Sequence, residues 1–498
     1  MRGKRSKFKV LRFFSGCIIC ALLVVTPMMT AYALPTAQAD AIQQLLNDAV
    51  RISGTPGLSV AVISDNQTHF FNAGHTSRSH RNNNTLVNAH TLYEIGSLSK
   101  AFTAVGILLL EEQGLLSTTD RIEDHLPWFY VTYQNEVVAV TIQQLLNHTS
   151  GFTQTHSDAP RGEGADMLRR TVEPFIGARL DFAPGSSYAY GNANYNILGL
   201  IIEVVSGQSY ESFMTAQVFE PLGLYQTFLH RAEAIATGRM AQGHRHAFFT
   251  TFGFDAPIYG GMKPTGFIIS STYDMARWMG IHLGLVQDIP DVFLRVIENA
   301  HQADTQGPPI GQPNMFYVGG WINIVDVGVL SHAGQTPNFL SNILLFTEEG
   351  QGIVFLSNGV NIDFNLVWSI KDILDGDLQQ SYTRSAAQQT DTINSIIIIL
   401  LSIGAMAGVA FGIRNRVKYK PVMTKTKVVI LSIFTLLAVF AMVEILLYPT
   451  FVGSGWAYIV DWNPPTITIL PFAMLIFYLT TAWFTYTKNR KPKVEEST

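Results

Sequence analysis

The sequence has little cysteine and little charge. Its 498 residues include two cysteines, Cys17 and Cys20, and both lie in an apolar run near the N-terminus. The rest of the chain therefore has no disulfide, no thiol nucleophile and no cysteine metal ligand. Charged residues make up 14% of the chain and hydrophobic residues 47%, a balance that indicates membrane segments. The net charge of -4 gives no reason to expect a polyanionic partner, and no nucleic-acid-binding pattern stands out.

Patterns for cofactor chemistry are also missing. No glycine-rich phosphate loop and no Rossmann fingerprint stand out along the chain. His244 and His246 form a His-x-His pair, but without an evident third ligand this pair favours a surface loop over a metal site. We therefore expect no metal and no cofactor.

The N-terminus has the pattern of an export signal. Basic residues between positions 2 and 12 precede the apolar run Phe13–Met29, and small-x-small sites follow at 31–33 and 37–39. This order is typical of a secretory signal peptide. We assign residues 1–39 to a signal peptide, and an uncleaved signal anchor is the alternative that gives the same topology.

Long apolar runs return at the other end of the chain, at Asn394–Ile413, Val428–Pro449 and Ile467–Tyr486. Each is close to the ~20 residues that a spanning helix needs, so we expect three transmembrane helices over residues 394–487. Lysine and arginine gather between the first two runs and after the third, whereas Asp461 alone is charged between the second and third. Because basic loops stay in the cytoplasm, the tail 488–498 is expected inside.

This topology predicts a multi-pass protein of the cytoplasmic (inner) membrane. Residues 40–384 then form a domain on its periplasmic or extracellular side, and the lipid bilayer is a partner of the chain. The polar segment 385–393 is expected to be the linker between that domain and the first span.

The exported region combines strand-like and helix-like patterns. Leu58–Ser64, Asn342–Phe346 and Gly352–Ser357 are apolar runs that predict strands. Ala101–Gly114 and Tyr195–Gly207 have helical periodicity and end at glycine. Strands at both ends, with helices and loops between them, favour a sheet built from the two ends of the domain and a helical insertion.

Ser97 and Lys100 are the most informative residues of the chain. If a helix starts near Ser97, a lysine three residues later lies on the same face, one turn away. A serine hydroxyl becomes a nucleophile when a base takes its proton. A lysine amine can be that base when burial lowers its pKa.

Two further patterns belong to the same chemistry. Tyr190 and Asn192 follow a Pro-Gly turn and precede a helix, so the phenol could pass a proton to a leaving group and the amide could bind substrate. The second pattern is His332 and Gly334, just before a strand. A glycine there allows close backbone approach, and the Gln335 N–H could join that of Ser97 in an oxyanion hole.

With Ser-x-x-Lys, Tyr-x-Asn and His-x-Gly in this order, the chain resembles the penicillin-recognising serine hydrolases, which include class C β-lactamases and D-Ala-D-Ala carboxypeptidases. The stretch Leu145–Phe152 is similar to that family too. The resemblance implies an α/β (α+β) β-lactamase/penicillin-binding-protein-like domain, with an antiparallel sheet flanked by helices and a helical subdomain. It implies Ser97 as nucleophile, Lys100 as base and Tyr190 as proton carrier. It also implies Asn192 and His332 as substrate contacts and the Gln335 N–H as an oxyanion donor.

The whole plan of signal, hydrolase domain and three spans resembles membrane-bound prodrug-activating peptidases of nonribosomal peptide pathways, of the colibactin, xenocoumacin and zwittermicin type. These remove an N-acyl-D-asparagine cap from an exported precursor. The resemblance implies an acyl-D-asparaginyl peptide precursor as substrate and leaves a precursor exporter open as a partner. It adds Asn338 as a contact for the cap amide. Lys263 is a further candidate, at a position where the colibactin relative has histidine.

Two alternatives remain open. A cell-wall D-alanyl carboxypeptidase, esterase or β-lactamase would use the same catalytic residues. A non-catalytic sensor of β-lactams or wall fragments would signal through the three spans, although the cytoplasmic segments are too short to hold a signalling domain.

Overall fold

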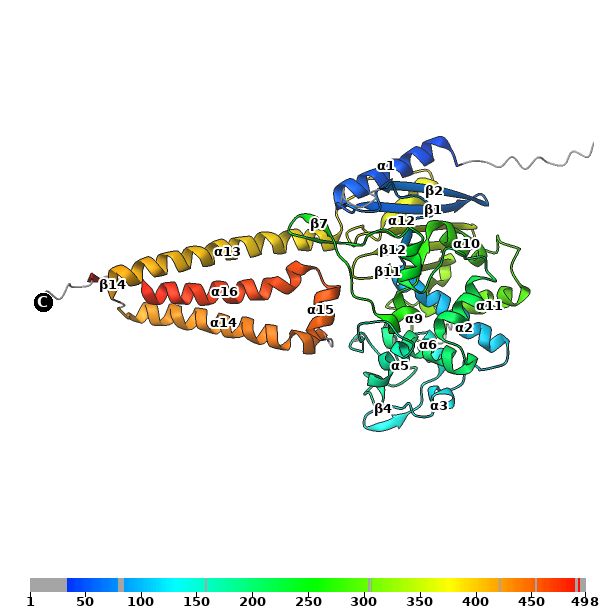
Figure 1. Cartoon of the computed structure of the whole chain (residues 1–498), viewed down its shortest axis with the longest axis horizontal. Coiled ribbons are helices and arrows are strands. Elements are labelled where there is room, and N and C mark those ends of the chain that lie inside the picture. Colours follow the sequence, from blue (N-terminus) through cyan, green and yellow to red (C-terminus); the bar gives the residue numbers. More distant parts are fainter. Residues whose placement is uncertain are drawn as a thin grey trace, which may run out of the picture.

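A computed structural model gives the structure of the protein. It describes residues 34–78, 85–156, 159–302, 305, 307–420, 422–452, 455–488 and 491–492. Most of the predicted signal segment, residues 1–33, lies outside this range, as does most of the expected tail. The described chain has a mixed domain at one end and three long, roughly parallel helices at the other (Figure 1).

One antiparallel sheet organises the domain. It has seven strands in the order β2-β1-β13-β12-β11-β10-β9. Their bounds are β1 Gly57–Ser64, β2 Gln67–Gly74, β9 Met315–Val318, β10 Trp321–Ile324, β11 Val329–Gln335, β12 Leu340–Phe346 and β13 Gln351–Ser357. β1, from the start of the domain, pairs with β13, from its end. The predicted strands and the predicted sheet from the two chain ends are therefore confirmed.

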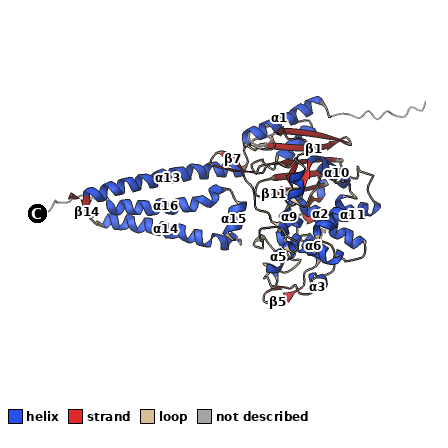
Figure 2. Ribbon diagram, viewed as in Figure 1, coloured by secondary structure: helices blue, strands red, loops and turns tan. Residues whose placement is uncertain are grey.

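Helices cover both faces of this sheet (Figure 2). α1 (Thr36–Ser53) and α12 (Leu366–Leu374) lie over one face, and their apolar residues share a core cluster with β1 and β13. α2 (Ser99–Glu112), α10 (Thr272–His282) and α11 (Asp291–His301) lie over the other. Both faces of β1 are buried as a result, which explains why its sequence is a continuous apolar run rather than an alternating one.

The predicted helix at Ala101–Gly114 is α2, the central helix of the domain. Every residue from Ser99 to Leu110 is buried, as expected for a helix that is apolar on all sides. Phe102 stacks on Trp278 of α10 with ring centroids 3.9 Å apart. The end of α2 that holds Ser99 and Lys100 is therefore fixed by a rigid core.

The helical insertion lies between β2 and β9. The predicted helix at Tyr195–Gly207 is α6 (Asn192–Ser206), and Gly207 ends it in the left-handed conformation. The other helices are α3 Ile122–His125, α4 Ile142–Leu146, α5 Met167–Val172, α7 Tyr210–Phe213, α8 Arg231–Ala236 and α9 Lys263–Gly266. Three short strand pairs complete it: β3 (Leu92–Glu94) with β8 (Ile269–Ser271), β4 (Val131–Tyr133) with β5 (Glu136–Val138), and β6 (His244–Ala247) with β7 (Thr250–Gly253).

The three apolar runs form α13 (Ala386–Lys418), α14 (Lys425–Val452) and α16 (Pro465–Thr487). All three are long and apolar enough to cross a membrane. The structure has a helix where the sequence predicts a linker at 385–393, because α13 begins at Ala386. A short helix, α15 (Trp456–Trp462), precedes α16.

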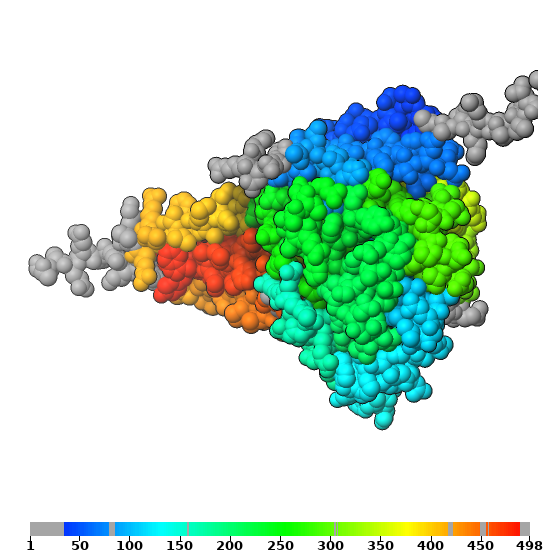
Figure 3. All heavy atoms as spheres, turned by 45° about the vertical axis from the view of Figure 1, so that its right-hand side comes forward, coloured from blue at the N-terminus to red at the C-terminus, as the bar shows by residue number. Residues whose placement is uncertain are grey.

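The domain rests directly on the ends of these helices (Figure 3). Asp461, at the end of α15, accepts hydrogen bonds from Arg161 and from the Tyr259 hydroxyl, both at 2.5 Å. The Thr466 hydroxyl at the start of α16 donates to Asp391 of α13 at 2.6 Å. The carboxylate of Asp461 thus joins the domain to the helical bundle.

We expect Asp461→Ala to loosen this junction. Asp461 is 5% exposed, and hydrogen bonds to a charged group contribute about 1.5–3 kcal/mol each. The variant should melt several degrees below the parent protein in detergent. Asp288→Ala is the matched control, because its ion pair with Arg277 lies at the surface, with 76% of the Asp288 side chain exposed, and it should leave the melting temperature unchanged. Equal melting temperatures for both variants would contradict the assigned role of Asp461.

Candidate active site

Ser97 lies in a tight turn between β3 and α2. The turn is a short 3-10 helix, Gly96–Leu98. Gly96 has a φ of +54°, and a Cβ on it would lie 2.3 Å from the backbone nitrogen of Gln335. Only glycine allows this conformation and this approach without strain. The end of β11 therefore lies against the turn that carries the hydroxyl.

The Lys100 amine lies beside that hydroxyl, as the three-residue spacing predicts. Its Nζ is 3.1 Å from Ser97 Oγ, 3.0 Å from Asn192 Oδ1 and 2.7 Å from the Thr265 carbonyl oxygen. The residue is fully buried, and this burial lowers the pKa of Lys100 well below its ordinary value. A neutral amine fits these contacts, because it can donate to Asn192 and Thr265 and offer its lone pair to the Ser97 hydroxyl.

Tyr190 approaches the same hydroxyl from the loop before α6. Its phenol donates to Ser97 Oγ at 2.8 Å, and Lys100 Nζ lies 4.8 Å from its ring centre. Burial is the main cause that raises the pKa of Tyr190 above its ordinary value. Ser97 therefore has the Lys100 amine on one side, with its pKa lowered by burial, and the Tyr190 hydroxyl as a hydrogen-bond donor on the other.

His148, in the stretch before α5, supports Tyr190 from behind. The two rings are 4.5 Å apart between centroids, and the Asn194 amide nitrogen lies 2.8 Å from His148 Nδ1. His148 is fully buried with a φ of +55°. Burial, followed by the nearby Lys100, lowers the pKa of His148 far below its ordinary value. A neutral imidazole thus fixes the position of the phenol.

His332 is also neutral, so it cannot bind substrate as a cation. Burial, followed by Lys100, lowers the pKa of His332 to about 3. Its Nδ1 lies 2.7 Å from the Ala333 carbonyl oxygen, and its Nε2 lies 3.0 Å from the Tyr317 hydroxyl. Tyr317 in turn packs against His148 at 4.4 Å. His332 therefore holds a layer of aromatic rings around Tyr190 and carries no positive charge.

The end of β11 is open to a substrate. β10 pairs with β11 only as far as Ser331, so none of the described strands pairs with the segment from His332 to Gln335 on that side. Gly334 allows β11 to lie close to the turn that carries Ser97, because a Cβ on it would be 2.2 Å from the Ile95 carbonyl oxygen. An extended chain can add to such an edge by main-chain hydrogen bonds.

Two predicted substrate contacts lie elsewhere. Asn338 is fully buried, and its amide nitrogen donates to the Phe254 carbonyl at 2.8 Å. Lys263 is also buried and forms an ion pair with Glu211 at 2.6 Å. Each polar group is bonded to protein, so substrate contact would require it to exchange that partner. The turn after β11 folds back on itself and turns Asn338 inward, which sequence proximity to His332 did not reveal.

Three residues that the sequence did not single out complete the site. Thr265 contributes a backbone carbonyl, and no side-chain pattern signals this. No sequence pattern pointed to Tyr317. His148 lies within the stretch Leu145–Phe152 that carries part of the family resemblance, so its position was visible but its function was not. Within the described ranges, no three histidine, cysteine or acidic side chains gather as a metal site would require.

Comparison with known proteins is consistent with this geometry. Protein flp of Staphylococcus aureus (strain N315) is 26% identical over 457 residues, which cover 88% of this chain and 89% of flp. Penicillin-binding protein 4 of Amycolatopsis lactamdurans is 31% identical over 244 residues, which cover 47% of this chain and 62% of that protein.

Two solved structures share the fold. The octameric penicillin-binding protein homologue from Pyrococcus abyssi has a TM-score of 0.54 and 23% identity, and the match covers 64% of this chain and 73% of that one. The beta-lactamase/D-alanine carboxypeptidase from Pseudomonas syringae has a TM-score of 0.57 and 18% identity, covering 68% and 99%. The predicted fold class is therefore confirmed.

The sequence profile described as Beta-lactamase matches residues 42–367. This range contains the whole sheet and every residue around Ser97. The chain belongs to the beta-lactamase family of serine hydrolases.

Proposed function

We propose that this protein is a membrane-held serine hydrolase that cleaves an amide bond after a D-configured residue through an acyl-enzyme. The observation that carries the proposal is the position of Ser97 Oγ, 3.1 Å from the Lys100 amine and 2.8 Å from the Tyr190 phenol. A buried neutral base and a hydroxyl donor on one serine are the groups that nucleophilic catalysis needs.

The reaction has two halves. Lys100 takes the Ser97 proton, and Oγ attacks the substrate carbonyl carbon. The resulting oxyanion is stabilised by the backbone N–H groups of Ser97 and Gln335. The C–N bond then breaks, and the leaving amine receives the proton from Lys100 by way of Tyr190. In the second half, water gives its proton to Lys100 and attacks the ester carbonyl carbon, the C–O bond to Ser97 breaks, and Lys100 returns the proton to Ser97 Oγ as the acid leaves.

The layout of the chain supports a finer assignment of the substrate. We propose an N-acyl-D-asparagine cap on an exported precursor, with the hydrolase domain outside the cytoplasmic membrane and the three helices α13, α14 and α16 in it. The Asn192 amide is available for this role, because its Oδ1 accepts from Lys100 and Thr265 and its nitrogen remains to donate to substrate.

A second candidate is a D-alanyl carboxypeptidase. It is favoured by the similarity to the beta-lactamase/D-alanine carboxypeptidase from Pseudomonas syringae and by the match to a penicillin-binding protein. The two candidates share every step at Ser97 and differ only in the side chain that the site accepts.

The catalytic residues are tested by substitution. Ser97→Ala should form no covalent adduct with a β-lactam or an acyl-D-amino acid anilide, as followed by intact-protein mass spectrometry. Lys100→Ala and Tyr190→Phe should each lower kcat/KM by about 10²–10⁴-fold, the usual contribution of a positioned acid or base. Tyr188→Phe is the matched control, because that tyrosine has no recorded bond to Ser97, and it should keep near-parental activity. An adduct on Ser97→Ala would refute the mechanism.

The substrate is tested with a matched pair. The N-acetyl anilide of D-asparagine should be hydrolysed well above that of D-alanine, and the L-asparagine compound should be the poorest. A site that hydrogen-bonds a substrate amide discriminates strongly against a compound that leaves it unpaired. Equal rates for the two D-compounds would favour the carboxypeptidase.

The pH dependence of kcat/KM follows from the lowered pKa of the Lys100 amine. Lys100 is active as a base only when deprotonated, and its pKa is lowered by burial, so kcat/KM should rise with pH through that lowered pKa and level off well below 10.5. Activity is lost as the pH falls and Lys100 takes up a proton. A pH–rate profile on an ester and an anilide checks this. A limb that still rises at 10.5, the ordinary value for lysine, would show a charged lysine and contradict the assignment.

A further inference from the structure

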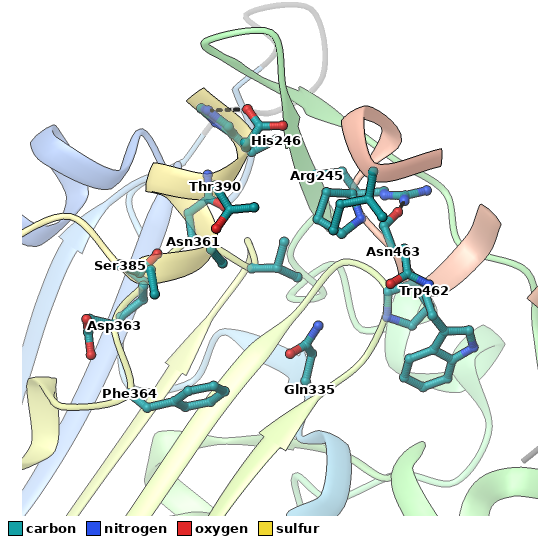
Figure 4. Close-up of a pocket in the computed structure, with 18 of the residues that line it drawn as sticks. Arg245, His246, Gln335, Asn361, Asp363, Phe364, Ser385, Thr390, Trp462 and Asn463 are labelled. Atoms are coloured by element: carbon teal, nitrogen blue, oxygen red, sulfur yellow. Dashed lines mark hydrogen bonds and ion pairs between the residues drawn. The ribbon is translucent and has the colours of Figure 1, made fainter. Parts of the chain in front are cut away.

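A cavity of about 560 Å³ lies between the hydrolase domain and the helical bundle. One wall is the end of β11 with Gln335 and Pro337, and a second is the loop after β13, residues 360–365. The third wall is formed by the first turn of α13 and by the segment from Trp462 to Ile467 (Figure 4). The cavity therefore begins beside the nucleophile turn and ends where the membrane spans begin.

The surface that the cavity offers to a ligand is largely apolar. Its carbon-rich residues include Pro337, Ile362, Phe364, Trp462, Pro464 and Ile467. Several polar side chains of the wall are already bonded to protein. The Arg245 guanidinium donates to the carbonyls of Val460 and Asn463, and His246 pairs with Asp391 at 3.5 Å. These groups hold the walls together, so the cavity is poorly suited to a charged headgroup.

Gln335 stands at the entrance from the active site. Its backbone nitrogen lies against Gly96, and its side chain is exposed and points into the cavity (Figure 4). No hydrogen bond of its side-chain amide appears among those of the described residues. The Gln335 side-chain amide thus lies between the Ser97 site and the apolar cavity, and it is available to bind a ligand.

We infer that the cavity binds the alkyl chain of an N-acyl substrate, and that the Gln335 side chain hydrogen-bonds the amide joining this chain to the residue at the scissile bond. The inference rests on the proposed function. A substrate extended along β11 passes from Ser97 to Gln335 and then to Pro337, which brings its acyl end into the cavity. The volume lies in the range of about 300–1,000 Å³ that ligand pockets occupy.

The position of the cavity also explains how such a chain enters. Its third wall is formed by the start of α13 and the start of α16, next to the apolar runs Asn394–Ile413 and Ile467–Tyr486. An alkyl chain dissolved in the outer leaflet can move into the cavity and remain out of water. The bundle then serves the reaction as part of the acyl-binding site as well as an anchor.

The experiment is a chain-length series on the full chain in lipid nanodiscs. The substrates are N-acetyl, N-butanoyl, N-hexanoyl and N-octanoyl D-asparagine anilides. Burial of one methylene corresponds to a factor of about four in kcat/KM, so the parent protein should gain this factor at each added CH₂ until the cavity is full. A flat series in the parent protein would overturn the inference, and a phospholipid chain would then be its occupant.

Two variants and a control locate the effect. Ala387→Phe places a ring into the wall from an exposed position at the start of α13, and should flatten the series beyond butanoyl. Gln389→Phe, also exposed on this turn and outside the cavity wall, should keep the full series. Gln335→Met retains the backbone N–H and should raise KM for acyl substrates about fivefold, the effect of one lost hydrogen bond. Equal chain dependence in both phenylalanine variants would place the chain elsewhere.

A binding measurement separates this inference from the proposed function. N-octanoyl-D-asparagine should raise the melting temperature of the Ser97→Ala protein more than N-acetyl-D-asparagine does, and Ala387→Phe should abolish the difference. If no anilide is hydrolysed but this difference is present, the hydrolase assignment fails and the acyl site stands. If acetyl substrate is hydrolysed and the difference is absent, the acyl site fails and the hydrolase assignment stands.

Discussion

The arrangement of this molecule depends on one buried amine without a carboxylate partner. Lys100 lies in the core with two carbonyl-type acceptors and a serine hydroxyl around it. Burying a charged amine costs several kcal/mol unless it is paired, so the surroundings favour the neutral form. A lysine in an ordinary helix end would be protonated and inert. Here the fold converts it into the proposed base for Ser97.

The rest of the structure holds the groups that make this environment. The rigid packing of α2 fixes the backbone of Lys100, and Gly96 lets β11 close over the nucleophile turn. The Thr265 carbonyl comes from a segment that the helical bundle supports. Tyr259 and Phe267, on either side of that segment, pack against Trp462 at 6.3 and 6.0 Å. The junction with the bundle therefore lies only a few residues from the lysine's own hydrogen-bond acceptor.

Sequence reasoning succeeded where the chemistry is local. The spacing of Ser97 and Lys100 predicts their contact because three residues make about one helical turn, and apolar runs predict β1, β12 and β13. It succeeded less where contacts join distant segments. Asn338 is predicted to contact substrate, and the sequence did not reveal that its amide donates to the Phe254 carbonyl, 84 positions away. The Thr265 carbonyl and the ring layer of His148 and Tyr317 have no local signature. Main-chain acceptors and packed rings become visible only in three dimensions.

The central claim is that Lys100 is neutral because it is buried. Its pKa can be measured by NMR on the full chain labelled with ¹³C at the lysine Cε, with the Lys100 signal identified as the one that Lys100→Arg removes. The account predicts a titration midpoint far below 10.5, the ordinary value for lysine. A Lys100 signal that titrates at or above 10.5 would contradict it, and the proton of Ser97 would then have to leave through another group.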